Sequence, residues 1–403
     1  MIVEGWEWVK AQDVMDIRDG THDSPQYQSS GIPLVTSKNL VDGQIDFSTC
    51  SLISQNDHEL ISKRSAVCDG DILYAMIGTI GNPVIVKKEY DFSIKNVALF
   101  KFNSDRAFNK YIYHFLNTDI AKRQFEKNSR GGTQKFVSLG NIRNLKIPLP
   151  PLEEQKRIAA VLDKADTLRR KRERAITLTD DLLRSVFLDM FGDPVTNPKG
   201  WEMKKFAKFA DLINGDRSKN YPSGKDIVKN GVLFLNTKNI INNQLDLSET
   251  SYITEEKFHS LTQGALKRND IVITLRGSLG SSCVFDSAFE TGFINAQMMI
   301  IRVKSEQISE KYVHSVLTFP TFKKMLKEMG SGSAVPQLTA SQIKELEIPI
   351  PSSDLWNHYK EVEQKIRQRT KSLVNQKNVI DSLFSSLTQR AFRGELTAQK
   401  EAV

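Results

Sequence analysis

The feature that most constrains the fold of this 403-residue chain is an internal repeat of its sequence. Segments from residues 5–150 return in the same order within residues 200–351, at an offset of 195 to 201 residues. Because all matches lie at nearly the same offset, the sequence predicts two copies of one structural unit. The matching pairs are GWEWVK (5–10) with GWEMKK (200–205), GIPLVTSKNL (31–40) with GVLFLNTKNI (231–240), GDILYAMIGTIG (70–81) with NDIVITLRGSLG (269–280), Asn96 with Asn295, and SLGNIRNLKIPLP (138–150) with TASQIKELEIPIP (339–351).

Within each copy, the first part and the last part follow different hydrophobic patterns. Up to the Pro-rich junctions KIPLPP and EIPIPS, short β-rich runs alternate with Gly, Asn, Ser and Thr turns, which predicts a compact α+β domain. After the junctions, in 152–191 and 355–392, apolar residues recur mostly every three or four positions. Such a narrow stripe is typical of a long helix that pairs with another helix. The prolines prevent either helix from beginning earlier.

The duplication also predicts how the parts are arranged. The first helix leads from the first domain to the second, and the second helix leaves the second domain from the equivalent point. If the two stripes pack together, the second helix must return antiparallel to the first. We therefore expect an α+β protein in which two similar domains are separated by two long antiparallel coiled-coil helices, with a pseudo-twofold internal repeat. The expected boundaries are 1–150 and 196–351 for the domains, and 151–195 and 352–403 for the helices with the C-terminal tail.

Composition excludes some classes of protein. Hydrophobic residues make up 39% and charged residues 26% of the chain, as in ordinary globular proteins. No apolar run approaches the ~20 residues that span a bilayer, so we expect no membrane contact. The three cysteines are scattered, without metal-ligand spacing, which predicts a cytoplasmic protein with no metal site. The net charge of +8 permits a nucleic-acid partner.

Four segments carry a resemblance to a known family. IPLPPLEEQKRIAAVLDKAD (147–166), the G-W-x-W/M-x-K start of each domain and AFRGELTAQ (391–399) resemble the specificity subunits of type I restriction–modification systems. The resemblance covers essentially the whole chain and implies two target-recognition domains, each of which reads one half of a split double-stranded DNA sequence. It implies helices that dock two modification subunits and, through them, restriction subunits. It also implies that methylation and cleavage, with S-adenosylmethionine, ATP and Mg²⁺, belong to those partners.

The DNA-binding role directs attention to four polar turns in each domain. Glycine lets a backbone approach a phosphate, and Thr, Lys, Asn, Gln and Arg reach base edges. Glycine and asparagine are also the ordinary residues of surface turns, an alternative that stays open for each turn. The candidates in the first domain are Gly20, Thr21, His22, Lys38, Asn39, Gly78, Thr79, Asn96, Arg130, Gly131, Gly132, Thr133, Gln134 and Lys135. Those in the second are Gly215, Arg217, Ser218, Lys219, Lys238, Asn239, Arg276, Gly277, Ser278, Asn295, Gln297, Ser331 and Ser333.

Motifs for catalysis are missing from the sequence. It contains neither the N/D-P-P-Y/F/W motif of amino-methyltransferases nor a Walker A sequence, so we expect no enzyme. Two alternatives to a type I specificity subunit remain. One is the same duplicated chain in a type II-like system, whose partner fuses methylation and cleavage. The other is a coiled-coil scaffold or RNA-binding protein, which the specific junction sequence disfavours.

Overall fold

The computed structural model describes residues 5–78, 80–128, 136–330 and 336–396. The chain divides into two units: unit 1 comprises residues 1–175 and 373–403, and unit 2 comprises residues 176–372. Unit 1 is therefore built from both ends of the chain, whereas unit 2 is one continuous segment.

Unit 1 is centred on a four-stranded antiparallel sheet of order β2-β10-β7-β8. These strands are Asp16–Asp19, Val97–Lys101, Ile72–Ala75 and Gly81–Ile85. The two central strands, β10 and β7, are buried along their whole length, which explains their nearly continuous apolar sequences. A second sheet of order β6-β3-β9 packs nearby, with β3 and β9 parallel. Its strands are Ser51–Ile53, Ile32–Val35 and Ser93–Ile94.

Unit 2 repeats this plan. Its central sheet has the order β13-β22-β19-β20, with strands Ala210–Asn214, Met298–Val303, Ile271–Thr274 and Ser282–Val284. Its second sheet has the order β14-β18-β15-β21, with strands Ile227–Val228, Tyr252–Ile253, Val232–Leu235 and Phe293–Ile294. Here β15 and β21 are the parallel pair. The duplication predicted from the sequence is thus present in the strand order.

Shorter elements complete each unit. In unit 1 they are β1 (Glu7–Lys10), β4 (Leu40–Val41), β5 (Gln44–Ile45), β11 (Lys146–Leu149), α1 (Gln55–Ser65), α2 (Asn109–Leu116), α3 (Asp119–Asn128), α4 (Leu139–Arg143) and the 3₁₀ turns η1 (Ala11–Asp13), η2 (Ser37–Asn39) and η3 (Phe47–Thr49). In unit 2 they are β12 (Glu202–Lys205), β16 (Ile240–Ile241), β17 (Gln244–Leu245), β23 (Glu347–Ile350), α6 (Phe206–Phe209), α7 (Glu255–Ser260), α8 (Glu310–Thr318), α9 (Pro320–Gly330), α10 (Ala340–Glu345), η4 (Gly224–Asp226) and η5 (Thr237–Asn239).

The Pro-rich junctions form the last strand of each unit. β11 pairs antiparallel with β1, and β23 pairs with β12. Two-stranded ribbons of this kind tolerate proline, because each strand has a free edge where no N–H is needed. A buried tyrosine hydroxyl closes each junction: Tyr111 donates to the carbonyl of Pro148, and Tyr312 donates to that of Pro349, both at 2.5 Å.

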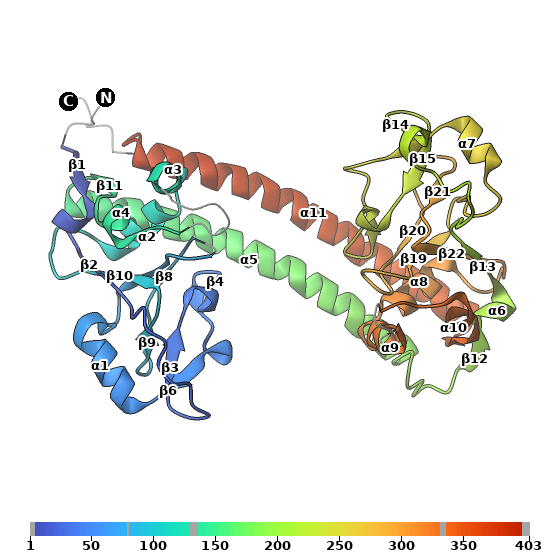
Figure 1. Ribbon diagram of the computed structural model, residues 1–403, viewed down its shortest axis with the longest axis horizontal. Helices are drawn as coiled ribbons and strands as arrows, with labels where there is room; N and C mark the ends of the chain where they lie inside the picture. The colour runs from blue at the N-terminus through green and yellow to red at the C-terminus, as the bar shows by residue number, and fades with distance from the viewer. Residues whose placement is uncertain (1–4, 79, 129–135, 331–335, 397–403) are drawn as a thin grey trace. The chain divides into compact units, whose positions relative to one another are not determined.

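A 40-residue helix follows each junction, namely α5 (Leu152–Phe191) and α11 (Ser353–Phe392). At 1.5 Å per residue, each is about 60 Å long. In unit 1 the start of α5 lies beside the end of α11 (Figure 1), and Ile158 and Leu162 share a core there with Phe392. In unit 2 the end of α5, with Phe191, packs against the start of α11, where its ring lies 5.1 Å from that of Tyr359.

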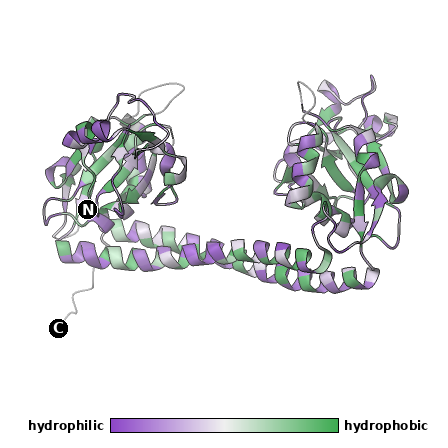
Figure 2. Ribbon diagram, turned by 90° about the horizontal axis from the view of Figure 1, so that it is seen from below, coloured by the Kyte–Doolittle hydropathy of each residue, from purple (hydrophilic) through white to green (hydrophobic). Residues whose placement is uncertain are grey.

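Hydropathy separates the sheets from the helices. The strands inside each unit are largely hydrophobic, whereas both long helices carry hydrophilic and hydrophobic residues along their length (Figure 2). Several leucines on these helices are exposed, including Leu168, Leu178, Leu182 and Leu383. No helix within the described residues is long and apolar enough to cross a membrane.

Gln155 fixes the beginning of α5, and its substitution provides a test of this junction. Its buried amide accepts a hydrogen bond from the Phe108 N–H (2.8 Å) and donates to the carbonyls of Arg106 (2.8 Å) and Pro150 (2.9 Å). Gln155→Glu would turn a carboxylate toward two carbonyl oxygens. We expect it to destabilise unit 1 by roughly 3 kcal/mol, since unpaired buried polar groups are costly.

Hydrogen exchange of β1 and β11 measures this loss. Lys156→Ala, on the exposed neighbouring residue, is the control and should leave exchange unchanged. Equal protection in Gln155→Glu and the wild type would show that the amide does not hold the junction.

Candidate nucleic-acid interface

One edge of the central sheet brings together two of the predicted turns in each unit. In unit 1, β2 ends and β10 begins there, since Asp19 lies opposite Ala98. β7 ends at the same edge, with Ala75 opposite Val97. The turns that follow β2 and β7, and Asn96 before β10, therefore lie together. Unit 2 has the same arrangement, with Asn214 and Thr274 opposite Met299 and Met298.

The turn after the first strand requires glycine for backbone packing. A Cβ atom on Gly20 would lie 2.2 Å from the Ile94 carbonyl oxygen, and one on Gly215 would lie 2.2 Å from the Asn295 carbonyl oxygen. Any other residue would push the turn away from the neighbouring segment. The observed geometry thus gives these glycines a structural role, whereas their predicted contact with DNA stays a prediction.

His22 links this turn to Asn96. Its Nδ1 lies 2.8 Å from Asn96 Oδ1 and its Nε2 lies 2.9 Å from Asp19 Oδ2. Two acceptors favour the imidazolium, in which both ring nitrogens donate. The hydrogen bonds to Asn96 and Asp19 therefore raise the pKa of His22, against burial and the charge of Arg64. Arg64 pairs with the same buried Asp19 carboxylate.

Unit 2 holds the equivalent turn differently. Asp216 is buried and accepts from the Ser218 N–H at 2.6 Å. Burial acts to raise the pKa of Asp216, but hydrogen bonds from Ser218 and Thr262 outweigh it and lower the pKa. Arg217 donates through Nε to the Ala296 carbonyl at 3.2 Å. The side chains of Arg217, Ser218 and Lys219 are exposed at this turn.

The turns η2 and η5 contain one exposed and one buried candidate each. Lys38 and Lys238 are exposed, but Asn39 and Asn239 are buried. Asn39 Nδ2 donates to the Asp46 carbonyl and to Thr49 Oγ1, and Asn239 Nδ2 donates to the carbonyls of Asp246 and Glu249. Their Oδ1 atoms accept from the backbone N–H of Thr36 and Asn236. Both amides are used inside the protein, so they shape the turn that presents the lysine.

The glycine turns after β7 and β19 share a backbone conformation, and the turn of unit 2 adds exposed polar side chains. Gly78 and Gly277 both have φ of 78°, where glycine is strongly favoured, and a Cβ atom would meet nothing within 4 Å. Arg276 and Ser278 are exposed beside Gly277. Gln297 accepts the Leu275 N–H through its carbonyl at 2.8 Å and so lies next to this turn.

Several predicted residues lie outside the described part of the chain. These are Thr79, Arg130, Gly131, Gly132, Thr133, Gln134, Lys135, Ser331 and Ser333. Three residues that were not predicted also lie at this edge, namely Ile77, Phe136 and Gln337. The internal repeat could have pointed to two of them, because Phe136 and Gln337 follow the corresponding segments SRGGTQK (129–135) and GSGSAV (330–335) in the sequence.

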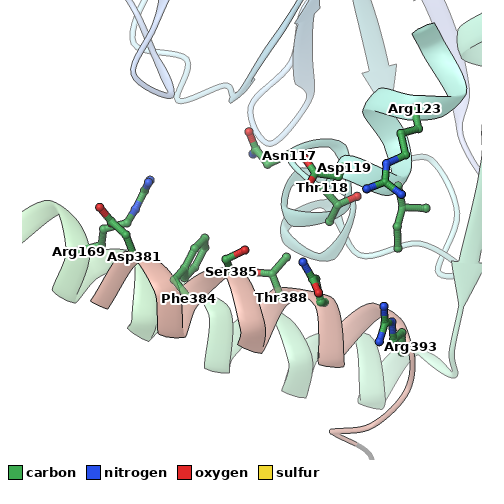
Figure 3. Close-up of a pocket in the computed structure, with 12 residues that line it drawn as sticks. Asn117, Thr118, Asp119, Arg123, Arg169, Asp381, Phe384, Ser385, Thr388 and Arg393 are labelled. Carbon is green, nitrogen blue, oxygen red and sulfur yellow. The ribbon is translucent and has the colours of Figure 1, made fainter. Parts of the chain in front are cut away.

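A second candidate surface in unit 1 is a cavity of about 380 Å³ between the α2–α3 connection and the two long helices (Figure 3). Arg123, Arg169 and Arg393 line it. Arg169 stacks over the ring of Phe384, with 5.2 Å from its guanidinium carbon to the ring centre. Asp381 Oδ1 and Thr388 Oγ1 are buried without a hydrogen-bond partner within the described structure. Mixed charge and apolar surface suit a protein partner better than a small substrate.

Comparison with known proteins identifies the family. The model of the type I restriction modification DNA specificity domain matches residues 3–178 and again residues 198–378. These two matches cover most of the chain, which therefore belongs to the family of type I restriction–modification specificity subunits. Specificity subunits of type I systems are non-catalytic, and the catalytic activities of these systems reside in other subunits.

Individual relatives agree with this assignment. The chain is 23% identical to the specificity subunit of the EcoBI type I enzyme from Escherichia coli, over 100% of this chain and 88% of that one. It is 23% identical to the MjaVIII specificity subunit of Methanocaldococcus jannaschii, over 79% and 75% of the two chains. A similar fold occurs in a chain from a structural study of type I R-M complex assembly and conformational transition, with a TM-score of 0.60, 19% identity and coverage of 98% and 100%. The S subunit from M. genitalium gives a TM-score of 0.53 at 13% identity, over 96% of both chains.

The pKa of His22 offers a test of the network at the edge of unit 1. A raised pKa means that protonated His22 stabilises the folded turn. This stabilisation is fully present below the unfolded pKa and is lost as pH rises through the folded pKa. We expect an NMR titration of the imidazole to give a pKa above its usual value near 6.5. Asn96→Ala should lower it toward that value, and Asn295→Ala, at the corresponding position of unit 2, should not change it. The network is refuted if the pKa in Asn96→Ala equals that of the wild type.

Proposed function

We propose that this chain is the DNA-reading subunit of a type I restriction–modification complex, in which each unit reads one half of a bipartite, asymmetric target. The observation that carries the proposal is the shared sheet edge of each unit. Exposed cations stand on polar turns in both units: Lys38 on η2 in unit 1, Lys238 on η5 in unit 2, and Arg276 beside Gly277 at the sheet edge of unit 2. Cations at such turns suit phosphates and guanine edges. Because the turns differ in sequence between the units, the two half-sites differ.

The two long helices separate the reading domains in this proposal. Residues 1–150 and 196–351 form the target-recognition domains, and residues 151–195 and 352–403 form an antiparallel coiled-coil spacer with a C-terminal tail. Support comes from each unit by itself, because the start of one helix packs there against the end of the other. The repeated strand order supports a pseudo-twofold relation.

The long helices α5 and α11 also bind the partner subunits in this proposal. Two modification subunits bind them and bring restriction subunits into the complex, while S-adenosylmethionine, ATP and Mg²⁺ act in those partners in the cytoplasm. Exposed leucines on α5 and α11 and the cavity around Phe384 support this docking role. Covering these leucines by a partner would remove apolar surface from water and so favour binding.

Exchanging one domain tests the division of labour. We expect a chimera with residues 196–351 from another family member, co-expressed with the modification subunit, to change one half of the methylated motif and leave the other half intact. Sequencing of methylated genomic DNA gives the motif. If both halves change together, or if methylation no longer depends on sequence, the two-domain mechanism is wrong.

Removing exposed leucines tests the docking surface. Leu168 is 55% exposed on α5 and Leu383 is 63% exposed on α11. We expect Leu168→Ser with Leu383→Ser to raise the solubility of the isolated chain and to weaken binding of the modification subunit at least about fivefold, as for an interface residue worth 1 kcal/mol. Titration of the purified subunits measures this affinity.

Leu60→Ser is the matched control, because Leu60 is 54% exposed on α1, away from the long helices. It should leave the affinity unchanged. Equal losses in the control and the double variant would mean that the leucines act through general solubility, and no loss in either would place the partner elsewhere.

A further inference from the structure

The two units place different side chains at one equivalent point of the sheet edge. In unit 1, Ile77 forms a backbone bridge with Phe136, and in unit 2, Arg276 forms one with Gln337. The neighbouring hydrogen bonds match as well: the Val137 N–H donates to the Met76 carbonyl and the Leu338 N–H to the Leu275 carbonyl, both at 2.9 Å. A glycine with φ of 78° follows in each unit. The backbones are therefore equivalent, and only the side-chain chemistry has changed.

In unit 2 this point presents a fixed guanidinium group. Arg276 is exposed and donates through Nε to Gln337 Oε1 at 2.9 Å. Within the described residues, no carboxylate lies in ion-pair distance of Arg276, so its charge is not neutralised there. With Nε held by Gln337, the two terminal nitrogens, Nη1 and Nη2, remain as a pair of parallel donors. That pair matches the O6 and N7 acceptors of guanine in the major groove.

In unit 1 the same point is apolar. The ring of Phe136 is 43% exposed, and Ile77 beside it is only partly buried against the core. A pair of hydrophobic side chains at this place offers no donor to guanine. It fits the C5-methyl group of thymine, the one apolar feature of the major groove.

We propose that these pairs are specificity-determining positions: Arg276, held by Gln337, reads a guanine in the half-site of unit 2, and Phe136 with Ile77 contacts a thymine methyl group in the half-site of unit 1. This inference rests on the proposed DNA-reading function and deepens it, because it assigns a base chemistry to each unit. Arg276 contacts the base, and Gln337 is a positioning residue that acts through it.

The experiment uses the complex with the modification subunits and DNA that contains the methylated motif. Each guanine of the unit 2 half-site is replaced in turn by 7-deazaguanine, which lacks the N7 acceptor. We expect one position at which affinity for the wild-type complex falls roughly 5- to 15-fold, because one of the two hydrogen bonds from Arg276 is lost while the O6 acceptor remains. In Arg276→Ala, that position should no longer distinguish guanine from 7-deazaguanine. Gln337→Ala should reduce the discrimination in part.

Arg268→Ala is the matched control, because Arg268 is another exposed arginine of unit 2 whose guanidinium donates to the Ser287 carbonyl. It should keep full discrimination at every guanine. If Arg276→Ala weakens binding equally for all sequences and leaves discrimination intact, Arg276 binds a phosphate and the assignment is overturned.

Unit 1 is tested by replacing each thymine of its half-site with uracil, which removes only the methyl group. We expect about fourfold weaker binding at one position, as for one buried methyl group. Phe136→Ala should abolish this difference. The double variant Ile77→Arg with Phe136→Gln carries the pair of unit 2 and should change the preferred base at that position from thymine to guanine.

Failure of this inference differs from failure of the proposed function. If the wild-type complex binds a bipartite motif but no thymine or guanine shows these effects, the pairs do not read bases and only the inference falls. If the wild-type complex shows no sequence preference, the proposed function falls with it.

Discussion

The architecture of each unit depends on how the chain passes from its last strand into a long helix. A proline-containing strand pairs with the first strand of the unit, and a buried tyrosine hydroxyl binds the proline carbonyl: Tyr111 with Pro148, and Tyr312 with Pro349. Because proline lacks an N–H group, its carbonyl is its only hydrogen-bonding backbone group. The tyrosine hydroxyl binds this carbonyl and so connects the strand to the core. The helix can therefore begin within two residues of the strand and leave in a defined direction.

The two units share internal hydrogen bonds but differ in other side-chain contacts. Asn39 and Asn239 hold their turns through the same amide geometry in both units. Around the short turns at Asp42 and Asn243 the side-chain partners of the two units differ. In unit 1, Arg170 donates to the carbonyl of Asp42 at 2.7 Å, whereas in unit 2, Lys323 reaches the Asn243 side chain at 3.0 Å. A shared scaffold with different exposed residues is what reading two unlike half-sites would require.

The sequence predicted the large features better than the roles of single residues. The repeat, the Pro-rich junctions and the helical stripes are local patterns, and the strand order and the two long helices agree with them. The buried positions of Asn39 and Asn239 were not predictable from TSKN and NTKN, because an asparagine in a polar turn looks the same whether its amide faces solvent or the backbone of a later loop. Phe136 was missed because its neighbour Ile77 lies far away in the sequence and meets it only at the sheet edge.

The composition of unit 1 from both chain ends has a consequence for synthesis. Phe392 packs against Tyr111 and Phe115, with ring centres 5.1 and 5.4 Å apart, and Leu396 lies against the same core. A ribosome adds these residues after those of unit 2, so the core of unit 1 stays uncovered at these aromatic rings while the continuous unit 2 can already fold. The usual order, in which the N-terminal domain is finished first, is reversed. A chain that stops before Phe392 lacks part of the core of unit 1 and leaves the rings of Tyr111 and Phe115 without this partner.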